Sequence, residues 1–210
     1  MFKKSSLAIM LSACMFSGAV LATGSDGYYL GLQLGESMSD YTTTGPGTMK
    51  YFDVPELPDA SIQNDAFAAR LYLGYQFNKY FAAEFAYDYF GTVTFDNIDN
   101  ISGSSADIRQ QGLDLTAKVM LPITKQFDVF ALGGLSYRGA KAQNISTTAD
   151  KLGLDAGGGT QYAFSPIYGL GADYNFNDAW GLDLAWRRFI QKDNLSQVSL
   201  ATAGVSYHFG

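Results

Sequence analysis

Residues 202–209 read Thr202-Ala203-Gly204-Val205-Ser206-Tyr207-His208-Phe209. Val205, Tyr207 and Phe209 alternate with small or polar residues, which predicts a β-strand with one apolar, aromatic face. Only Gly210 follows, so we expect no soluble tail to cover that face. Such a strand fits a closed β-barrel whose outer face meets lipid, because in lipid every backbone polar group must be paired within the protein.

Other segments of the chain show the same two-residue alternation, which is typical of a strand that exposes its two faces to different surroundings. With the closing stretch there are eight such segments: 28–36, 66–77, 80–90, 110–121, 126–138, 162–176, 180–189 and 198–209. In seven of them aromatic and leucine side chains gather on one face, and glycine, polar and charged residues on the other. In 126–138 both faces are apolar around Val129 to Leu132, so the orientation of this segment is left open.

The connections between these segments alternate strictly in length. Short turns are expected at 78–79, 122–125 and 177–179, and long polar loops at 37–65, 91–109, 139–161 and 190–197. Transmembrane barrels have short periplasmic turns and longer outer loops, and their tilted strands of about 10 residues match the bilayer. A soluble β-sandwich would need a polar outer face instead. The pattern therefore predicts an all-β, eight-stranded antiparallel up-and-down transmembrane β-barrel.

Eight charged residues within the predicted strands lie on the non-aromatic face. They are Arg70, Glu84, Asp88, Asp114, Lys118, Asp173, Asp183 and Arg187. A charge that faced the bilayer midplane would cost about 2–4 kcal/mol, so these side chains are expected to point into the lumen. An eight-stranded barrel is just wide enough for side chains to fill, and buried charges need partners. We therefore predict a lumen charge network.

The N-terminus has the pattern of a secretory signal peptide. Lys3 and Lys4 precede a run without charge over residues 5–22, and polar residues follow. We expect residues 1–22 to be a signal peptide and residues 23–210 to be the barrel domain. Two alternatives are an uncleaved anchor helix and lipidation of Cys14, which ends a lipobox-like Leu-Ser-Ala-Cys stretch.

Composition argues against several classes of function. The formal net charge is -6, and removal of Lys3 and Lys4 with the signal peptide makes it -8, which disfavours binding to nucleic acid. Cys14 is the only cysteine and His208 the only histidine, so no metal-ligand spacing and no cofactor are expected. Ser206 beside His208 could form a nucleophile–base pair, but His208 is expected on the periplasmic rim, and we predict no enzyme. The acidic stretch 96–100 lacks the full calcium-loop pattern and is expected to be a loop tip.

Several short motifs resemble a known family. They are Gly27-Tyr28-Tyr29-Leu30-Gly31, Gly74-Tyr75-Gln76-Phe77-Asn78, Thr116-Ala117-Lys118 before Pro122-Ile123, Ser165-Pro166, and Val205-Ser206-Tyr207-His208-Phe209-Gly210. Together they resemble the transmembrane domain of the outer-membrane protein A (OmpA) family over essentially the whole mature chain. The last motif is also similar to the C-terminal signal read by the outer-membrane assembly machinery, with Gly204, Tyr207 and Phe209 at the expected spacing. The final Gly210 departs from that signal.

The resemblance implies a bacterial outer-membrane protein that contacts lipid, lipopolysaccharide and the assembly machinery. It also implies an internal salt-bridge gate in which a lysine and an arginine compete for glutamates. Glu84, Lys118 and Asp173 match three gate positions, whereas Asp183 stands where the family has arginine, and Arg187 or Arg70 would have to substitute. The peptidoglycan-binding domain of two-domain family members is expected to be absent.

Two functions are expected from these features. The first is a structural barrel of the cell envelope. If it conducts at all, it passes only small solutes, through a narrow pore lined by paired charges. The second is surface recognition, including contact with a host-cell surface, through the long loops, above all 37–65 with Tyr41, Tyr51 and Phe52. Aromatic girdles are expected at both interfaces. We place Tyr80, Trp180, Tyr207 and Phe209 at the short turns, and Tyr28, Tyr89 and Phe164 nearer the loops.

Overall fold

The computed structural model describes residues 27–43, 60–146 and 159–209. Long strands make up nearly all of this part, and their bounds are β1 Gly27–Ser39, β3 Asp65–Asn78, β4 Phe81–Asp96, β5 Ser105–Pro122, β6 Phe127–Gln143, β7 Thr160–Asn175, β8 Trp180–Phe189 and β9 Val198–Phe209. Two shorter elements are strand β2 (Ser61–Gln63) and the 3₁₀ turn η1 (Ile98–Asn100). Among the described residues, no helix is long and apolar enough to cross a membrane.

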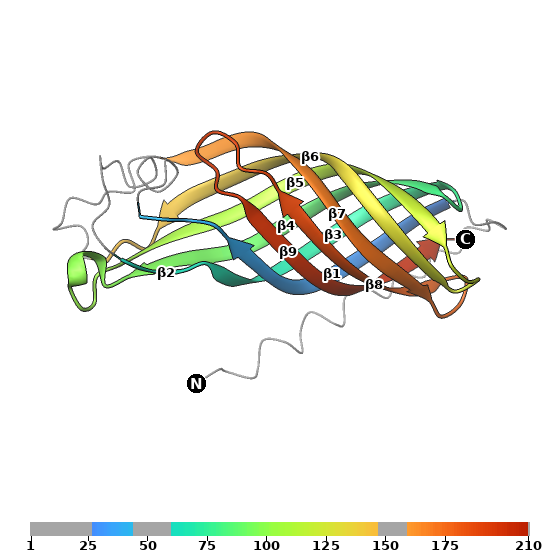
Figure 1. The fold of residues 1–210 in the computed structure, drawn as a ribbon, viewed down its shortest axis with the longest axis horizontal. Coiled ribbons are helices and arrows are strands. Elements are labelled where there is room, and N and C mark those ends of the chain that lie inside the picture. Colours follow the sequence, from blue (N-terminus) through green and yellow to red (C-terminus); the bar gives the residue numbers. More distant parts are fainter. Residues whose placement is uncertain (1–26, 44–59, 147–158, 210) are drawn as a thin grey trace.

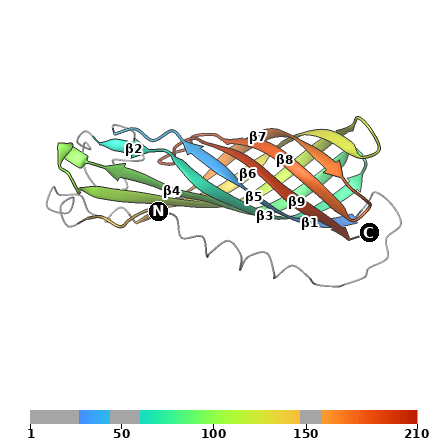
Figure 2. The ribbon, with the colours of Figure 1, turned by 90° about the horizontal axis from the view of Figure 1, so that it is seen from below.

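The eight long strands close into an antiparallel barrel. Their order is β4-β3-β1-β9-β8-β7-β6-β5, and pairing of β4 with β5 completes the circle. The first and last strands meet along their whole length, from Tyr28 opposite Phe209 to Ser39 opposite Val198. Figures 1 and 2 show an elongated cylinder of tilted strands, with the end of β9 at the same end as the short turns. The predicted eight-stranded up-and-down barrel is confirmed.

The outer wall of the barrel is apolar. Leu115 and Leu184 are 63% and 60% exposed, values that suit a lipid-facing surface far better than a soluble one. Near the short turns, edge-to-face aromatic contacts join Tyr28 to Tyr75 and Trp180 to Tyr207. The prediction that Tyr28 lies nearer the loops is wrong, because β1 starts at the short-turn end, where Tyr28 pairs with Phe209.

The outer ends of the strands run further than the alternation predicted. The expected loop 91–109 is mostly strand, since β4 continues to Asp96, β5 begins at Ser105, and only residues 97–104 turn between them. A bulge at Gly91 (φ 78°) precedes this extension. Residues such as Thr92 and Thr94 are polar, which hid their strand conformation. In Figure 2 the β4–β5 hairpin projects well beyond the rest of the barrel, and β2 lies beside it.

The orientation of β6, which the sequence left open, is resolved by the burial of its side chains. Phe130, Leu132, Ser136 and Arg138 are buried in the lumen, whereas Leu135 and Tyr137 face outwards. Two apolar side chains, Phe130 and Leu132, therefore line the lumen, which is why both faces of this segment look apolar in sequence.

Candidate functional site in the barrel lumen

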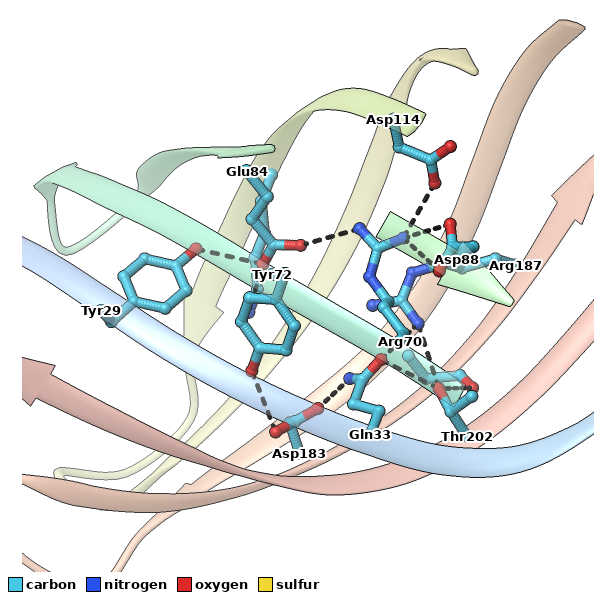
Figure 3. A network of polar contacts seen from close by, with 12 residues as sticks. Tyr29, Gln33, Arg70, Tyr72, Glu84, Asp88, Asp114, Asp183, Arg187 and Thr202 are labelled. Atoms are coloured by element: carbon cyan, nitrogen blue, oxygen red, sulfur yellow. Dashed lines mark hydrogen bonds and ion pairs between the residues drawn. The ribbon is translucent and has the colours of Figure 1, made fainter. Parts of the chain in front are cut away.

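Arg70 is the centre of a buried ion-pair cluster. Its Nη1 atom lies 2.8 Å from Asp88 Oδ2 and 2.8 Å from Asp114 Oδ2, and its Nη2 atom lies 3.5 Å from Glu84 Oε2. These residues come from three neighbouring strands, β3, β4 and β5, and all of them point inwards (Figure 3). Arg70, Asp88 and Asp114 are essentially inaccessible to solvent. One guanidinium therefore pairs with carboxylates from both following strands.

Lys118 forms a second cluster, closer to the short turns. Its Nζ atom lies 2.7 Å from Asp173 Oδ2 on β7, the next strand but one, and 3.6 Å from Glu84 Oε1. The ammonium also lies 4.0 Å from the ring centroid of Phe130. Glu84 accepts a further hydrogen bond from the hydroxyl of Tyr29 at 3.0 Å. Glu84 is thus shared between Lys118 and Arg70 and couples the two clusters.

Asp183 and Arg187 are placed in the lumen as predicted, but hydrogen bonds rather than ion pairs hold them. Asp183 accepts a hydrogen bond from the Tyr72 hydroxyl at 3.0 Å and another from Gln33 Nε2. Arg187 Nη1 donates to Gln33 Oε1 at 2.8 Å and to Thr202 Oγ1 at 3.1 Å. Within the described residues neither of the two forms an ion pair.

Asp183 and Arg187, two of the eight charges of the predicted network, therefore take part in it through hydrogen bonds. Gln33 lies between them and bonds to both, because its amide offers a donor to the carboxylate and an acceptor to the guanidinium (Figure 3). Of the two arginines considered as substitutes for the missing gate arginine, Arg70 contacts Glu84. Arg187 does not form that ion pair among the contacts of the described chain.

Tyr29 and Tyr72 were missed as members of this site. Each ring lies over a glycine of the neighbouring strand: the register pairs Tyr29 with Gly74 and Tyr72 with Gly31. A Cβ atom at Gly31 would lie 2.1 Å from the Cζ atom of Tyr72, so these rings occupy the space that the glycines leave. The signal was present in the sequence, since both tyrosines stand on the glycine-rich inner face of their strands.

Arg138, also missed, closes the lumen on the outer side of the ion-pair clusters. Its Nη2 atom donates to Gln110 Oε1 at 3.2 Å and to the backbone oxygen of Ser196 at 2.8 Å. Its guanidinium carbon lies 5.5 Å and 5.7 Å from the ring centroids of Phe90 and Phe189. Its charge was not assigned to the lumen because the orientation of 126–138 was left open.

An apolar cluster fills the barrel beyond Arg138. Its buried members are Tyr41, Val93, Phe95, Ile98, Ala106, Ile108, Ala140, Ala142, Ala163 and Leu195. Leu195 comes from the loop between β8 and β9, so this loop folds inwards and seals the outer end. Tyr41, expected as an exposed recognition residue, is only 3% exposed here, whereas Tyr51 and Phe52 lie outside the described residues.

The periplasmic end of the lumen holds a polar cavity of about 40 Å³, room for a few water molecules. Lys118, Asp128, Asp173 and His208 are among its lining residues. His208 lies at the rim, as predicted, and its ring stacks on Tyr29 with centroids 5.0 Å apart. In the described part of the chain, no group of three or more histidine, cysteine, aspartate or glutamate residues is placed to hold a metal ion.

The three residues of the predicted assembly signal all lie in β9. Gly204 lies between β1 and β8, opposite Gln33 and Asp183, where a Cβ atom would come within 2.2 Å of the Leu32 backbone oxygen. The ring of Tyr207 contacts Trp180 and Phe209 edge-to-face, with centroids 5.0 Å and 5.1 Å apart.

Comparison with solved structures supports the architecture. The fold is similar to OprG from Pseudomonas aeruginosa (TM-score 0.60, 14% identity, 88% of this chain and 98% of that chain). It is also similar to Ail, the attachment invasion locus protein of Yersinia pestis (TM-score 0.52, 14% identity, 87% of this chain and 99% of that chain). At these identities the likeness concerns the fold alone.

Sequence comparison gives the family. The chain is 30% identical over 220 residues to outer membrane protein A of Salmonella typhi and 28% identical over 220 residues to that of Yersinia pseudotuberculosis. In both cases the match covers 99% of this chain and 56% of the relative, so the chain spans about half the length of these relatives. These outer-membrane relatives place the protein in the bacterial outer membrane. The model of the OmpA-like transmembrane domain matches residues 23–210, and the chain belongs to this family.

Proposed function

We propose that the protein is a structural barrel of the outer membrane whose lumen is closed at rest and admits only small ions when its side chains rearrange. The observation that carries this proposal is the contact of Arg70 with carboxylates on β4 and β5, which ties the lumen side chains together at mid-depth. On the periplasmic side of Arg70 the lumen is filled by the Lys118–Asp173 cluster, and on the outer side by the apolar cluster. A solute would have to displace both.

Any current through the lumen is expected to prefer cations. On the periplasmic side of Arg70, Lys118 faces Glu84 and Asp173, and Asp183 and half-buried Asp128 lie near. Carboxylates therefore outnumber the ammonium there, and rings of acidic side chains favour cations in pores. The path is narrow, because the cavity at this end has a volume of only about 40 Å³.

Planar-bilayer recording of the purified protein tests the proposal. A heat-modifiable shift on a gel first confirms that the barrel is folded. Rare, small openings with a cation-selective reversal potential in a salt gradient are expected. Frequent large openings, or selectivity for anions, would contradict a lumen closed by these side chains. A folded but silent barrel would leave the structural role and remove the pore.

A second candidate function is recognition at the cell surface. The observation that favours it is the β4–β5 hairpin, which extends past the barrel and ends in the turn 97–104, where Ile101 is exposed. One structural neighbour is an attachment invasion locus protein. Replacing residues 97–104 by a short Asn-Gly turn should leave the barrel folded and reduce adhesion of bacteria to host cells. Unchanged adhesion would count against this hairpin as the recognition element.

The two ends of the chain would direct export and assembly of the barrel. Residues 1–22, outside the described residues, would be removed by signal peptidase, and mass spectrometry of the exported protein would give the first residue of the mature chain.

At the other end of the chain, Gly204, Tyr207 and Phe209 would form the signal read by the assembly machinery. Replacing Phe209 by alanine should lower the amount of folded barrel in the outer membrane. The matched change Leu184→Ala removes another outward apolar side chain away from the signal and should leave assembly nearly unchanged.

A further inference from the structure

Two cationic side chains lie directly opposite each other on the outer wall. Arg109 on β5 and Lys141 on β6 are register partners, and both are exposed on the outward face of the barrel. Side chains directly opposite in an antiparallel pair have Cβ atoms about 4.5–5.5 Å apart. Threonines flank the pair in the same row, Thr92 on β4 and Thr160 on β7.

The described residues supply no carboxylate within ion-pair distance of these two cations. Across the described ranges, neither Arg109 nor Lys141 forms an ion pair. Asp107, two residues from Arg109 on the same face, is engaged by Thr94 Oγ1 at 2.9 Å and Asn144 Nδ2 at 2.9 Å. Like charges directly opposite each other are destabilising, so an anion bound between them would stabilise this arrangement.

Other cations at the outer end of the barrel have partners. Arg188 lies 3.5 Å from Asp40, and Lys192 lies 3.8 Å from Asp193. Both of these pairs are at least partly exposed, as Arg109 and Lys141 are. Among these four described cations, only the β5–β6 pair therefore lacks a carboxylate partner within ion-pair distance.

Aromatic residues set the height of the cation pair relative to the membrane. The guanidinium of Arg109 lies 5.2 Å from the ring centroid of Tyr89. On β6, Tyr137 lies four residues from Lys141 towards the membrane. Its ring stacks on Tyr162, with centroids 5.4 Å apart, and packs against Phe164, with centroids 4.9 Å apart. Such girdles mark the membrane–water interface, so a pair just beyond them lies at the level of the lipid headgroups.

We infer that Arg109 and Lys141 form a binding site for the phosphate groups of an anionic glycolipid of the outer leaflet, namely the lipid A part of lipopolysaccharide. The arginine fork binds phosphate oxygens in bidentate fashion, and the lysine adds a point charge beside it. Below the pair, exposed Leu113, Leu115 and Leu135 provide an apolar wall for the acyl chains of the same molecule.

The test uses protein purified from outer membranes, freed of lipid and reconstituted in phosphatidylcholine nanodiscs. Affinity for lipid A is measured for the wild type, for Arg109→Gln with Lys141→Gln, and for the matched control Arg188→Gln with Lys192→Gln. A surface cation contributes about 1 kcal/mol to binding of anionic lipid, or roughly fivefold in affinity. The Arg109–Lys141 variant is therefore expected to bind about 25-fold more weakly, whereas the control should stay near wild type.

Lipid A without phosphates separates charge from apolar contact. The wild type should bind it as weakly as the Arg109–Lys141 variant binds the phosphorylated form, and the variant should not distinguish the two lipids. Equal binding of phosphorylated lipid A by wild type and variant would overturn the site. Displacement of lipid A by millimolar inorganic phosphate would show a site for soluble anions and also overturn the assignment to a lipid.

Folding is checked independently, by the thermal unfolding midpoint in non-ionic detergent. There the anion is absent, and removing one of two facing like charges should leave the midpoint unchanged or raise it. A lower midpoint for Lys141→Gln would mean that the pair is stabilised from within the protein and would contradict the inference.

Discussion

The Nη1 atom of Arg70 lies 2.8 Å from a carboxylate oxygen of Asp114, although β4 separates their strands. The same nitrogen lies 2.8 Å from Asp88 on that intervening strand. A single cation thus holds two aspartates in a region with no access to solvent. Without it, two negative charges would face each other in a medium of low dielectric constant, which is unfavourable.

Replacing Arg70 by methionine should strongly destabilise the barrel. The apolar side chain fills much of the space but leaves Asp88 and Asp114 without a cation. Breaking a buried pair by removal of one partner typically costs about 3–5 kcal/mol. Urea unfolding in lipid vesicles would measure the change. The control Arg188→Met removes an exposed pair with Asp40 and should cost no more than about 1 kcal/mol. A similar small loss for both variants would show that the Arg70 cluster contributes little.

Replacing Lys118 by alanine should both destabilise the protein and ease passage through the lumen. The change leaves Glu84 and Asp173 short of a cation and removes a long side chain beside the periplasmic cavity. More frequent cation-selective openings in planar bilayers and a lower unfolding midpoint are expected. Lys125→Ala, in the exposed turn between β5 and β6, is the matched control. If conductance and midpoint both stay unchanged for Lys118→Ala, Lys118 has no part in closing the lumen.

The inward placement of the charges could be predicted from sequence because a strand has a strict two-residue period. Once the aromatic face of each strand is assigned to lipid, the side chains of Arg70, Glu84 and Lys118 can only point inwards. Which of these side chains touch could not be predicted. The alternation assigns a side chain to a face but not to a depth along the barrel axis. Contacts between non-adjacent strands, such as Lys118 with Asp173, depend on strand tilt and stagger.

The outer end of the barrel was the least predictable part. Above the membrane a strand has no lipid to face, so polar residues such as Thr92 and Thr94 occupy its outer side and the aromatic alternation stops. The sequence therefore appeared to be a loop where the structure has a hairpin with its own apolar cluster. Tyr41 was taken as exposed for the same reason, since its burial depends on partners far along the chain, such as Phe95.

Adding a side chain at Gly31 should disturb the polar network from a distance. A Cβ atom there would lie 2.2 Å from the hydroxyl oxygen of Tyr72, which donates to Asp183 at 3.0 Å. The ring would have to move and the hydrogen bond would be lost. We expect Gly31→Ala to cost about 1–3 kcal/mol, as overpacking usually does. Gly133→Ala is the control, because its Cβ atom would meet nothing nearer than 3.8 Å. Equal unfolding free energies for the two variants would contradict the close approach of Tyr72.

Truncating Leu195 should loosen the outer seal without unfolding the membrane-spanning wall. Leu195 is 1% exposed and packs in the outer apolar cluster, and the adjacent Ser196 backbone oxygen accepts a hydrogen bond from Arg138. A buried leucine-to-alanine change typically costs about 2–5 kcal/mol. Here much of that cost should appear as local opening of the loop between β8 and β9, because the neighbouring strands are held by their own hydrogen bonds.

Limited proteolysis and hydrogen exchange would detect this local opening. We expect faster cleavage within residues 190–197 of Leu195→Ala, together with faster exchange of their amides, while the heat-modifiable gel shift of the barrel is retained. Ile190→Ala is the matched control, since Ile190 is an apolar residue of the same loop with 38% of its surface exposed. Equal cleavage rates for the two variants would mean that Leu195 does not hold the loop inside the barrel, and that the outer seal depends on the hairpin residues alone.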